Sequence, residues 1–163
     1  LVKYILDKQL KDGGWAYSGD KAEPDMTAMA LQALAAYYKT DAKVKEAADK
    51  AVTCLSKLQN TTGGYDSYGS VNSESVAQVI TALTALGIDP DNDARFVKNG
   101  ASVLDSLCGF YVDGGGFRHV SDGKLDPTAT AQGYYALAAY YRFAGSQTAL
   151  YDMTDLDTVE KAA

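Results

Sequence analysis

Acidic side chains in two similar phrases are the residues of this chain best suited to proton chemistry. Asp25 follows Glu23-Pro24, and Asp126 precedes Pro127. An aspartate held protonated in an apolar cavity can donate a proton to an alkene or an epoxide. At the start of a helix the same residue can instead accept hydrogen bonds from free backbone N–H groups. Because a catalytic acid is usually unique and this phrase recurs, we interpret both aspartates as helix caps and keep Asp25 as the candidate acid.

A second acidic run has the spacing of a cation site. Asp89, Asp91 and Asp93 match the first ligands of an EF-hand calcium loop. Such a loop also needs glycine at its sixth position and glutamate at its twelfth, where this chain has Ala94 and Gly100. The run therefore predicts a turn between helices, in which Asp91 or Asp93 caps the helix that follows.

Histidine and cysteine are scarce, which limits transition-metal chemistry. The chain has His119, Cys54 and Cys108 and no other residue of these two types. Neither cysteine belongs to a CxxC motif, and both fall on apolar positions of predicted helices, where a buried free thiol is common. We expect a solvated loop position for His119, no disulfide, and neither a bound metal nor a cofactor.

Aromatic residues give the best indication of a ligand site. The chain has 12 tyrosines, including the adjacent pair Tyr134 and Tyr135, while Trp15, Tyr65 and Phe117 follow paired glycines. Aromatic rings with polar tips suit ligand contact in a concave face. The alternative is that these rings fill the space between packed helices, and the repetition of the glycine-aromatic phrase favours it. We keep all five residues as candidate ligand-binding positions.

The glycine-aromatic phrase also indicates which elements position these residues. Gly13-Gly14-Trp15, Gly63-Gly64-Tyr65 and Gly115-Gly116-Phe117 each follow a helical stretch and precede a helix rich in alanine. The aromatics lie 50 and then 52 residues apart, and a fixed period near 50 residues marks an array of helical units. We predict a single domain over 1–163, with repeats at about 1–40, 41–88 and 89–145 and a C-terminal capping segment at 146–163.

Apolar residues recur at helical spacing, and no alternation typical of a strand has useful length. The paired helices of each unit begin at Asp25, at Ser73-Glu74-Ser75 and at Asp126, and the residues at these starts are expected to cap them. Gly87 suits the position just after a helix. The first expected helix ends near Gln9. The next five cover about 25–39, 42–59, 73–86, 96–107 and 126–143. A short last helix begins at Thr154 with Asp157.

Composition excludes several classes of function. The 163 residues carry a net charge of −6, with 47% hydrophobic and 22% charged residues. A negative chain lacks the basic face that nucleic-acid binding needs, and it does not favour anionic membranes. No apolar run approaches the roughly 18 residues that span a bilayer. Since Leu1 begins inside a helical pattern, we expect the chain to be a fragment of a longer protein.

The repeats resemble those of the terpenoid cyclase and protein prenyltransferase superfamily. In that superfamily a glutamine stands six residues before the aromatic, as Gln9 does before Trp15 and Gln59 before Tyr65. In the third unit Cys108 takes the glutamine position, nine residues before Phe117. The resemblance implies an α/α toroid of which three hairpins form about half. Gly87-Ile88-Asp89-Pro90 and the following segment are similar to domains of bacterial secreted or cell-surface proteins.

The catalytic motifs of these enzymes are incomplete here. Class II triterpene cyclases carry an acidic run in which Asp25 would match the proton donor, but Met26 replaces its acidic neighbour. The zinc site of the prenyltransferases has no counterpart. We therefore predict an all-α, non-catalytic module of a secreted or surface protein that binds a small molecule or a protein on its concave face. The alternative is a terpene cyclase-like lyase or isomerase with Asp25 as its acid. A half ring could also pair with a second copy or with the rest of the toroid.

Overall fold

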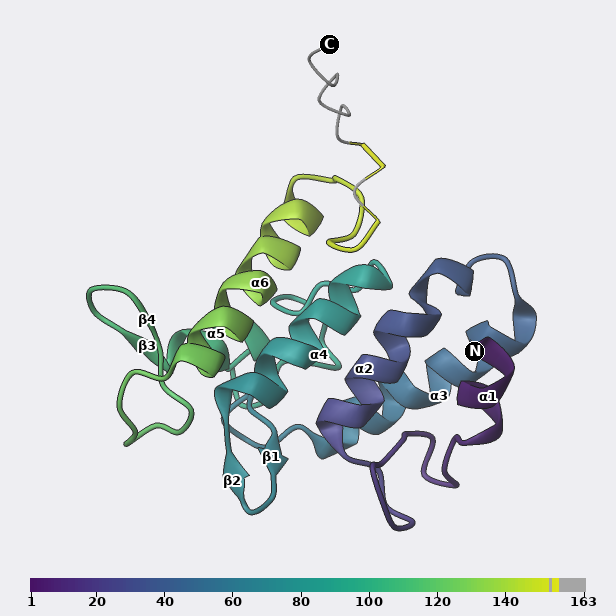
Figure 1. Cartoon of the computed structure of the whole chain (residues 1–163), viewed down its shortest axis with the longest axis horizontal. Coiled ribbons are helices and arrows are strands. Elements are labelled where there is room, and N and C mark those ends of the chain that lie inside the picture. Colours follow the sequence, from purple (N-terminus) through teal and green to yellow (C-terminus); the bar gives the residue numbers. More distant parts are fainter. Residues whose placement is uncertain (153, 156–163) are drawn as a thin grey trace.

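The computed structural model describes residues 1–152, 154 and 155, and helices account for most of the regular structure there (Figure 1). A 3-10 turn, η1 (Ala35–Tyr37), extends the second helix. The helices are α1 (Val2–Asp7), α2 (Pro24–Leu34), α3 (Ala42–Leu58), α4 (Ser73–Ala85), α5 (Val103–Cys108) and α6 (Pro127–Ala144).

Helices α2, α4 and α6 form a row in which α4 packs against both of the others (Figure 1). Helix α3 packs against α2, helix α5 packs against α4, and α1 contacts α2 and α3. The row and its covering helices therefore make two layers. The all-α prediction is confirmed at this coarse level, whereas the ring itself stays a prediction.

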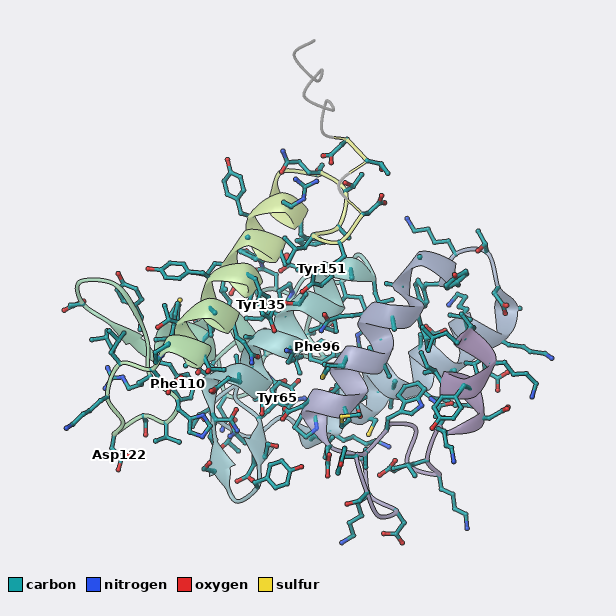
Figure 2. All side chains as sticks on the ribbon, viewed as in Figure 1. Tyr65, Phe96, Phe110, Asp122, Tyr135 and Tyr151 are labelled. Atoms are coloured by element: carbon teal, nitrogen blue, oxygen red, sulfur yellow. The ribbon has the colours of Figure 1, made fainter. Side chains whose placement is uncertain are left out.

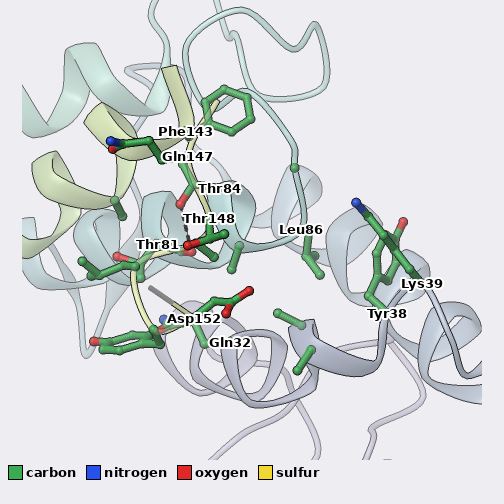
Figure 3. A pocket seen from close by; sticks show the side chains of 18 of the residues that line it. Gln32, Tyr38, Lys39, Thr81, Thr84, Leu86, Phe143, Gln147, Thr148 and Asp152 are labelled. Atoms are coloured by element: carbon green, nitrogen blue, oxygen red, sulfur yellow. Dashed lines mark hydrogen bonds between the residues drawn. The ribbon is translucent and has the colours of Figure 1, made fainter. Parts of the chain in front are cut away.

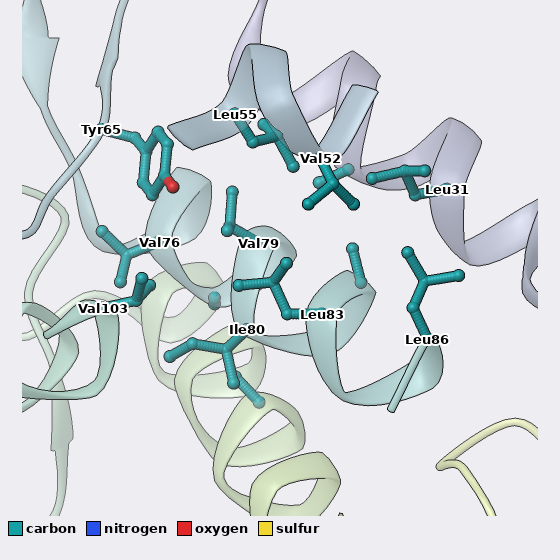
Figure 4. Close-up of a cluster of buried hydrophobic side chains, with 14 of the residues drawn as sticks. Leu31, Val52, Leu55, Tyr65, Val76, Val79, Ile80, Leu83, Leu86 and Val103 are labelled. Atoms are coloured by element: carbon teal, nitrogen blue, oxygen red, sulfur yellow. The ribbon is translucent and has the colours of Figure 1, made fainter. Parts of the chain in front are cut away.

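The core lies between the two layers (Figure 4). Leu31 of α2, Val52 and Leu55 of α3, and Val79 and Leu83 of α4 are each at most 1% exposed. Their three- and four-residue spacing is that of one helix face. The opposite face of the row is consequently free to carry polar and small side chains.

Two short hairpins were not predicted. Strands β1 (Asp66–Ser67) and β2 (Ser70–Val71) pair antiparallel, as do β3 (Tyr111–Val112) and β4 (Gly116–Phe117). Each strand has only two residues, which is too few for an alternating pattern to be seen in the sequence.

Close packing explains why glycine precedes the aromatic in the first and third of these pairs. A Cβ on Gly14 would lie 2.6 Å from Thr27 Oγ1, and one on Gly116 would lie 2.5 Å from Thr130 Oγ1. The two threonine hydroxyls accept from the backbone N–H of Trp15 and of Phe117, both at 3.0 Å. Glycine is therefore needed to bring this turn against the following helix.

Helix starts match the predicted caps only in part. Asp126 caps α6 as predicted, because its side chain accepts from Ala129 N. In α2 the proline at the first helical position makes Glu23 the N-cap residue, so Asp25 lies inside the first turn and is not a cap. Helix α4 is capped by Asn72, which accepts from Ser75 N, one residue before the predicted group.

The predicted helix over 96–107 is wrong for its first half. Helix α5 begins only at Val103, after a cap at Ser102. Asn99 and Gly100 have φ of +51° and +83° and turn the chain so that Lys98 pairs with Ala101. An Asn-Gly pair favours this kind of tight turn over a helix. The predicted last helix lies largely outside the described residues, Asp157 included, and Thr154 is in a turn.

Candidate functional site

A cavity of about 800 Å³ lies near the C-terminal ends of α2, α4 and α6 (Figure 3). The helices supply one side of it. The other side is residues 146–152, which follow α6 and are called the C-terminal strap below. The volume is within the range of small-molecule sites in proteins.

Small side chains create this space. Ala36 from η1, Ala85 from α4 and Ala139 from α6 line the cavity, together with Gly87 after the end of α4. None of these side chains extends beyond a methyl group, so the three helices leave a hollow where larger residues would fill it. The alanine-rich character of the second helix of each unit therefore has a direct structural consequence.

The two threonines that α4 contributes to the cavity wall donate their hydroxyl protons to backbone carbonyls of the same helix. Thr81 Oγ1 donates to Ala77 O at 2.9 Å, and Thr84 Oγ1 donates to Ile80 O, also at 2.9 Å. A hydroxyl has one proton and two lone pairs. Both side chains therefore offer the cavity acceptor oxygens.

A network of amides crosses the helix row beside the cavity. Gln32 Nε2 donates to Gln78 Oε1 at 2.8 Å, and Gln78 Nε2 donates to Gln132 Oε1 at 3.0 Å and to the hydroxyl of Tyr135. The Tyr135 hydroxyl, whose pKa burial raises to about 12, donates to Gln132 Oε1. The network ties α2, α4 and α6 together at the face that carries the cavity.

The C-terminal strap is fixed by one buried arginine. Arg142 Nε donates to Thr148 O at 2.9 Å, and its Nη2 contacts Asp155 Oδ1 at 2.5 Å. The hydrogen bond from Thr148, assisted by Arg142, lowers the pKa of Asp155. In the described part of the chain, the strap's hydrogen bonds to α6 go to Arg142 and Phe143. The strap is thus attached at one end of α6 and borders the cavity along the rest of its length.

Three of the predicted ligand-binding aromatics belong to the core. Trp15, Tyr65 and Phe117 are only 4%, 0% and 1% exposed. Trp15 Nε1 donates to Ile5 O at 2.7 Å, and burial raises the pKa of the Tyr65 hydroxyl. These rings offer a ligand almost no surface, and they fill the space between helices.

The tyrosine pair on α6 is divided between two environments. Tyr134 is 47% exposed, and its ring packs edge-on against Phe117 with centroids 5.7 Å apart. Tyr135 belongs to the amide network that leads through Gln78 to Gln32, a cavity-lining residue. Of the five predicted positions, Tyr135 is therefore the one that the structure connects to the cavity.

Asp25 occupies an unusual position for a helical acid. Its Oδ2 accepts from Ser67 Oγ at 3.1 Å, and its Oδ1 is buried without a hydrogen-bond partner in the described chain. The carboxyl is half-buried and does not line the cavity. Since the residue is not a cap, the structural explanation preferred from the sequence does not apply to it.

The remaining candidate residues form separate local contacts. His119 is exposed as predicted, and its Nδ1 lies 2.8 Å from Glu74 Oε2. Both cysteines are free, but only Cys54 is buried, so the burial expected for Cys108 is wrong. No group of three potential metal ligands occurs within residues 1–152, 154 and 155.

The acidic run at 89–93 is a set of turn contacts. Asp89 Oδ1 accepts from Asp91 N at 2.9 Å. Asp91 accepts from Ser102 Oγ at 2.7 Å, and Asp93 pairs with Arg95 at 2.7 Å. The predicted turn is present, but neither Asp91 nor Asp93 is the N-cap of the next helix, because Ser102 has that role.

Comparison with protein-family models gives no match, and no curated protein matches the sequence. The likeness to terpenoid cyclase repeats therefore depends on the residues quoted above. No helix in the described chain combines the length and the apolar character that a membrane crossing requires.

Sequence reasoning missed most of the cavity-lining residues. Gln32, Thr81 and Asp152 carry no motif, and their role depends on where helices and strap meet. A weak indication was present in α4, where Thr81 and Ala85 are four residues apart and lie opposite the apolar stripe of Val79 and Leu83.

Proposed function

We propose that this protein is a non-catalytic binding module that takes a small molecule between its helix row and the C-terminal strap. The observation that carries the proposal is the cavity of about 800 Å³, walled by small side chains and by polar groups of the same helices. We place the module in a bacterial secreted or surface protein, as part of an α/α toroid of hairpin repeats. That setting is supported by the sequence resemblance alone.

Filling the cavity tests the proposal. Ala85 lines the cavity, so Ala85→Trp replaces its methyl group with an indole that occupies the space. Ala94 is exposed in the segment before α5, so Ala94→Trp is the matched control. We expect the neutral dye Nile red to gain fluorescence with the unmodified protein and with Ala94→Trp but not with Ala85→Trp. Equal fluorescence from all three proteins would contradict a ligand site in this cavity.

The alternative function, a terpene cyclase-like lyase or isomerase, is favoured by one observation. Asp25 has a half-buried carboxyl whose Oδ1 is buried without a hydrogen-bond partner in the described chain, so this oxygen is not committed to a structural contact there. The experiment is incubation with squalene and analysis of the products by gas chromatography. Formation of a cyclised product that is lost in Asp25→Asn would replace the binding proposal with this one.

A further inference from the structure

We propose that the ligand of the cavity is an amine, bound as an ammonium ion with Asp152 of the C-terminal strap as its counter-ion. This inference rests on the proposed binding function and adds the chemical class of the ligand. It comes from a count of hydrogen-bond donors and acceptors around the cavity.

The helix side of the cavity presents acceptors. The protons of Thr81 and Thr84 point to backbone carbonyls of α4, as described above. Gln32 uses its Nε2 on Gln78, bonding both the backbone O at 3.2 Å and the side-chain Oε1 at 2.8 Å. Apart from the ammonium group of Lys39, what these side chains leave toward the cavity is oxygen lone pairs, and these match a ligand rich in N–H groups.

Asp152 supplies the negative charge. It is the one carboxylate among the described residues that line the cavity. Figure 3 shows this strap residue beside Gln32. Its backbone N–H donates to Ala149 O, whereas no hydrogen bond or ion pair of its carboxylate occurs in the described structure. A carboxylate with unused acceptors at the edge of an acceptor-lined cavity favours a cation.

The position of the positively charged residue of the cavity lining, Lys39, also fits an ammonium group bound at Asp152. Lys39 is the basic residue of the cavity lining, and Leu86 lies between it and Asp152 in the view of Figure 3. In that view an ammonium group at Asp152 would lie on the other side of Leu86 from the lysine. Tyr151 and Phe143 also line the cavity, and aromatic rings attract cations at their faces.

The test compares two probes that differ in charge, phenethylamine and 2-phenylethanol, by isothermal titration calorimetry. The decisive variant is Asp152→Asn. Asp122→Asn removes the same charge from an exposed loop far from the strap (Figure 2) and is the matched control. Ala85→Trp fills the cavity and should abolish binding of both probes.

We expect phenethylamine to bind more tightly than 2-phenylethanol to the unmodified protein. Asp152→Asn should weaken phenethylamine about fivefold, the effect of one exposed ion pair, and leave 2-phenylethanol unchanged. Equal affinity for both probes, or equal losses in Asp152→Asn and Asp122→Asn, would overturn the amine assignment and leave the cavity proposal standing. If neither probe binds while Nile red still does, the amine assignment is likewise overturned and the cavity proposal stands. Absence of binding by both probes and by Nile red would overturn both proposals.

Discussion

Gly133 is the residue at which packing and helix propensity oppose each other most directly. It lies inside α6, where a Cβ would come within 2.4 Å of Phe117 Cδ2. Alanine is favoured over glycine in a helix by about 1 kcal/mol, but overpacking of a core costs about 1–3 kcal/mol. We expect Gly133→Ala to lower the free energy of unfolding in urea denaturation. Gly109→Ala, whose nearest contact would be Ser106 O at 3.3 Å, is the control, and a more stable Gly133→Ala protein would refute the packing argument.

The half-buried hydroxyl of Tyr135 predicts a loss of stability at high pH. Burial raises its pKa to about 12, against about 10 in an unfolded chain. Its contribution is complete below pH 10 and is lost as the pH rises toward 12, because the unfolded chain releases the proton first. We expect the free energy of unfolding to fall between pH 10 and 12, and Tyr135→Phe to reduce that fall by at most about 2 kcal/mol. The exposed Tyr141→Phe is the control, and identical pH dependence in Tyr135→Phe would contradict the prediction.

Asp126 and Asp25 show that helix capping can be predicted from the sequence and that a distant side-chain contact cannot. Asp126 and Asp25 occur in similar phrases, yet only Asp126 caps a helix. The difference is the proline, which takes the first helical position and leaves the cap to the residue before it. That order is readable in the sequence. The contact of Asp25 with Ser67 is not, because it joins residues 42 positions apart.

At the scale of elements, the C-terminal strap depends on one ion pair. The Arg142 side chain is only 9% exposed where it meets Asp155, and the same arginine bonds Thr148. We expect Asp155→Asn to speed amide hydrogen exchange in residues 146–152, as measured by mass spectrometry, because the turn loses its charged anchor. Asp152→Asn, which leaves Arg142 paired, should exchange like the unmodified protein. Equal protection of the strap in Asp155→Asn would show that the Arg142–Asp155 ion pair does not hold it.

Long periodic helices were predictable, and short interrupted ones were not. Helices α3, α4 and α6 fall within the predicted ranges to within a few residues, because 13 to 18 residues carry a clear apolar stripe. Helix α5 has six residues, so its stripe could not be separated from the apolar residues Phe96 and Val97 that precede it. In that segment the Asn99-Gly100 pair predicts a tight turn, which the structure has before α5.

At the scale of the whole molecule, sequence order and spatial order agree in the helix row. Helix α4, the middle one in sequence, is also the middle one in space and has the most buried residues of the three. The period near 50 residues predicts that these helices belong to equivalent units, and that stays a prediction. The period could not anticipate the cavity, because that space depends on the path of the strap after α6, which no repeat supplies.

The single attachment of the C-terminal strap has a kinetic consequence. The strap borders the cavity and is held to α6 through Arg142 and Phe143. Weakening the arginine contacts would free the strap to move, and a ligand would then both enter and leave the cavity faster. A change at Arg142 would therefore alter the two rates more than their ratio, the affinity.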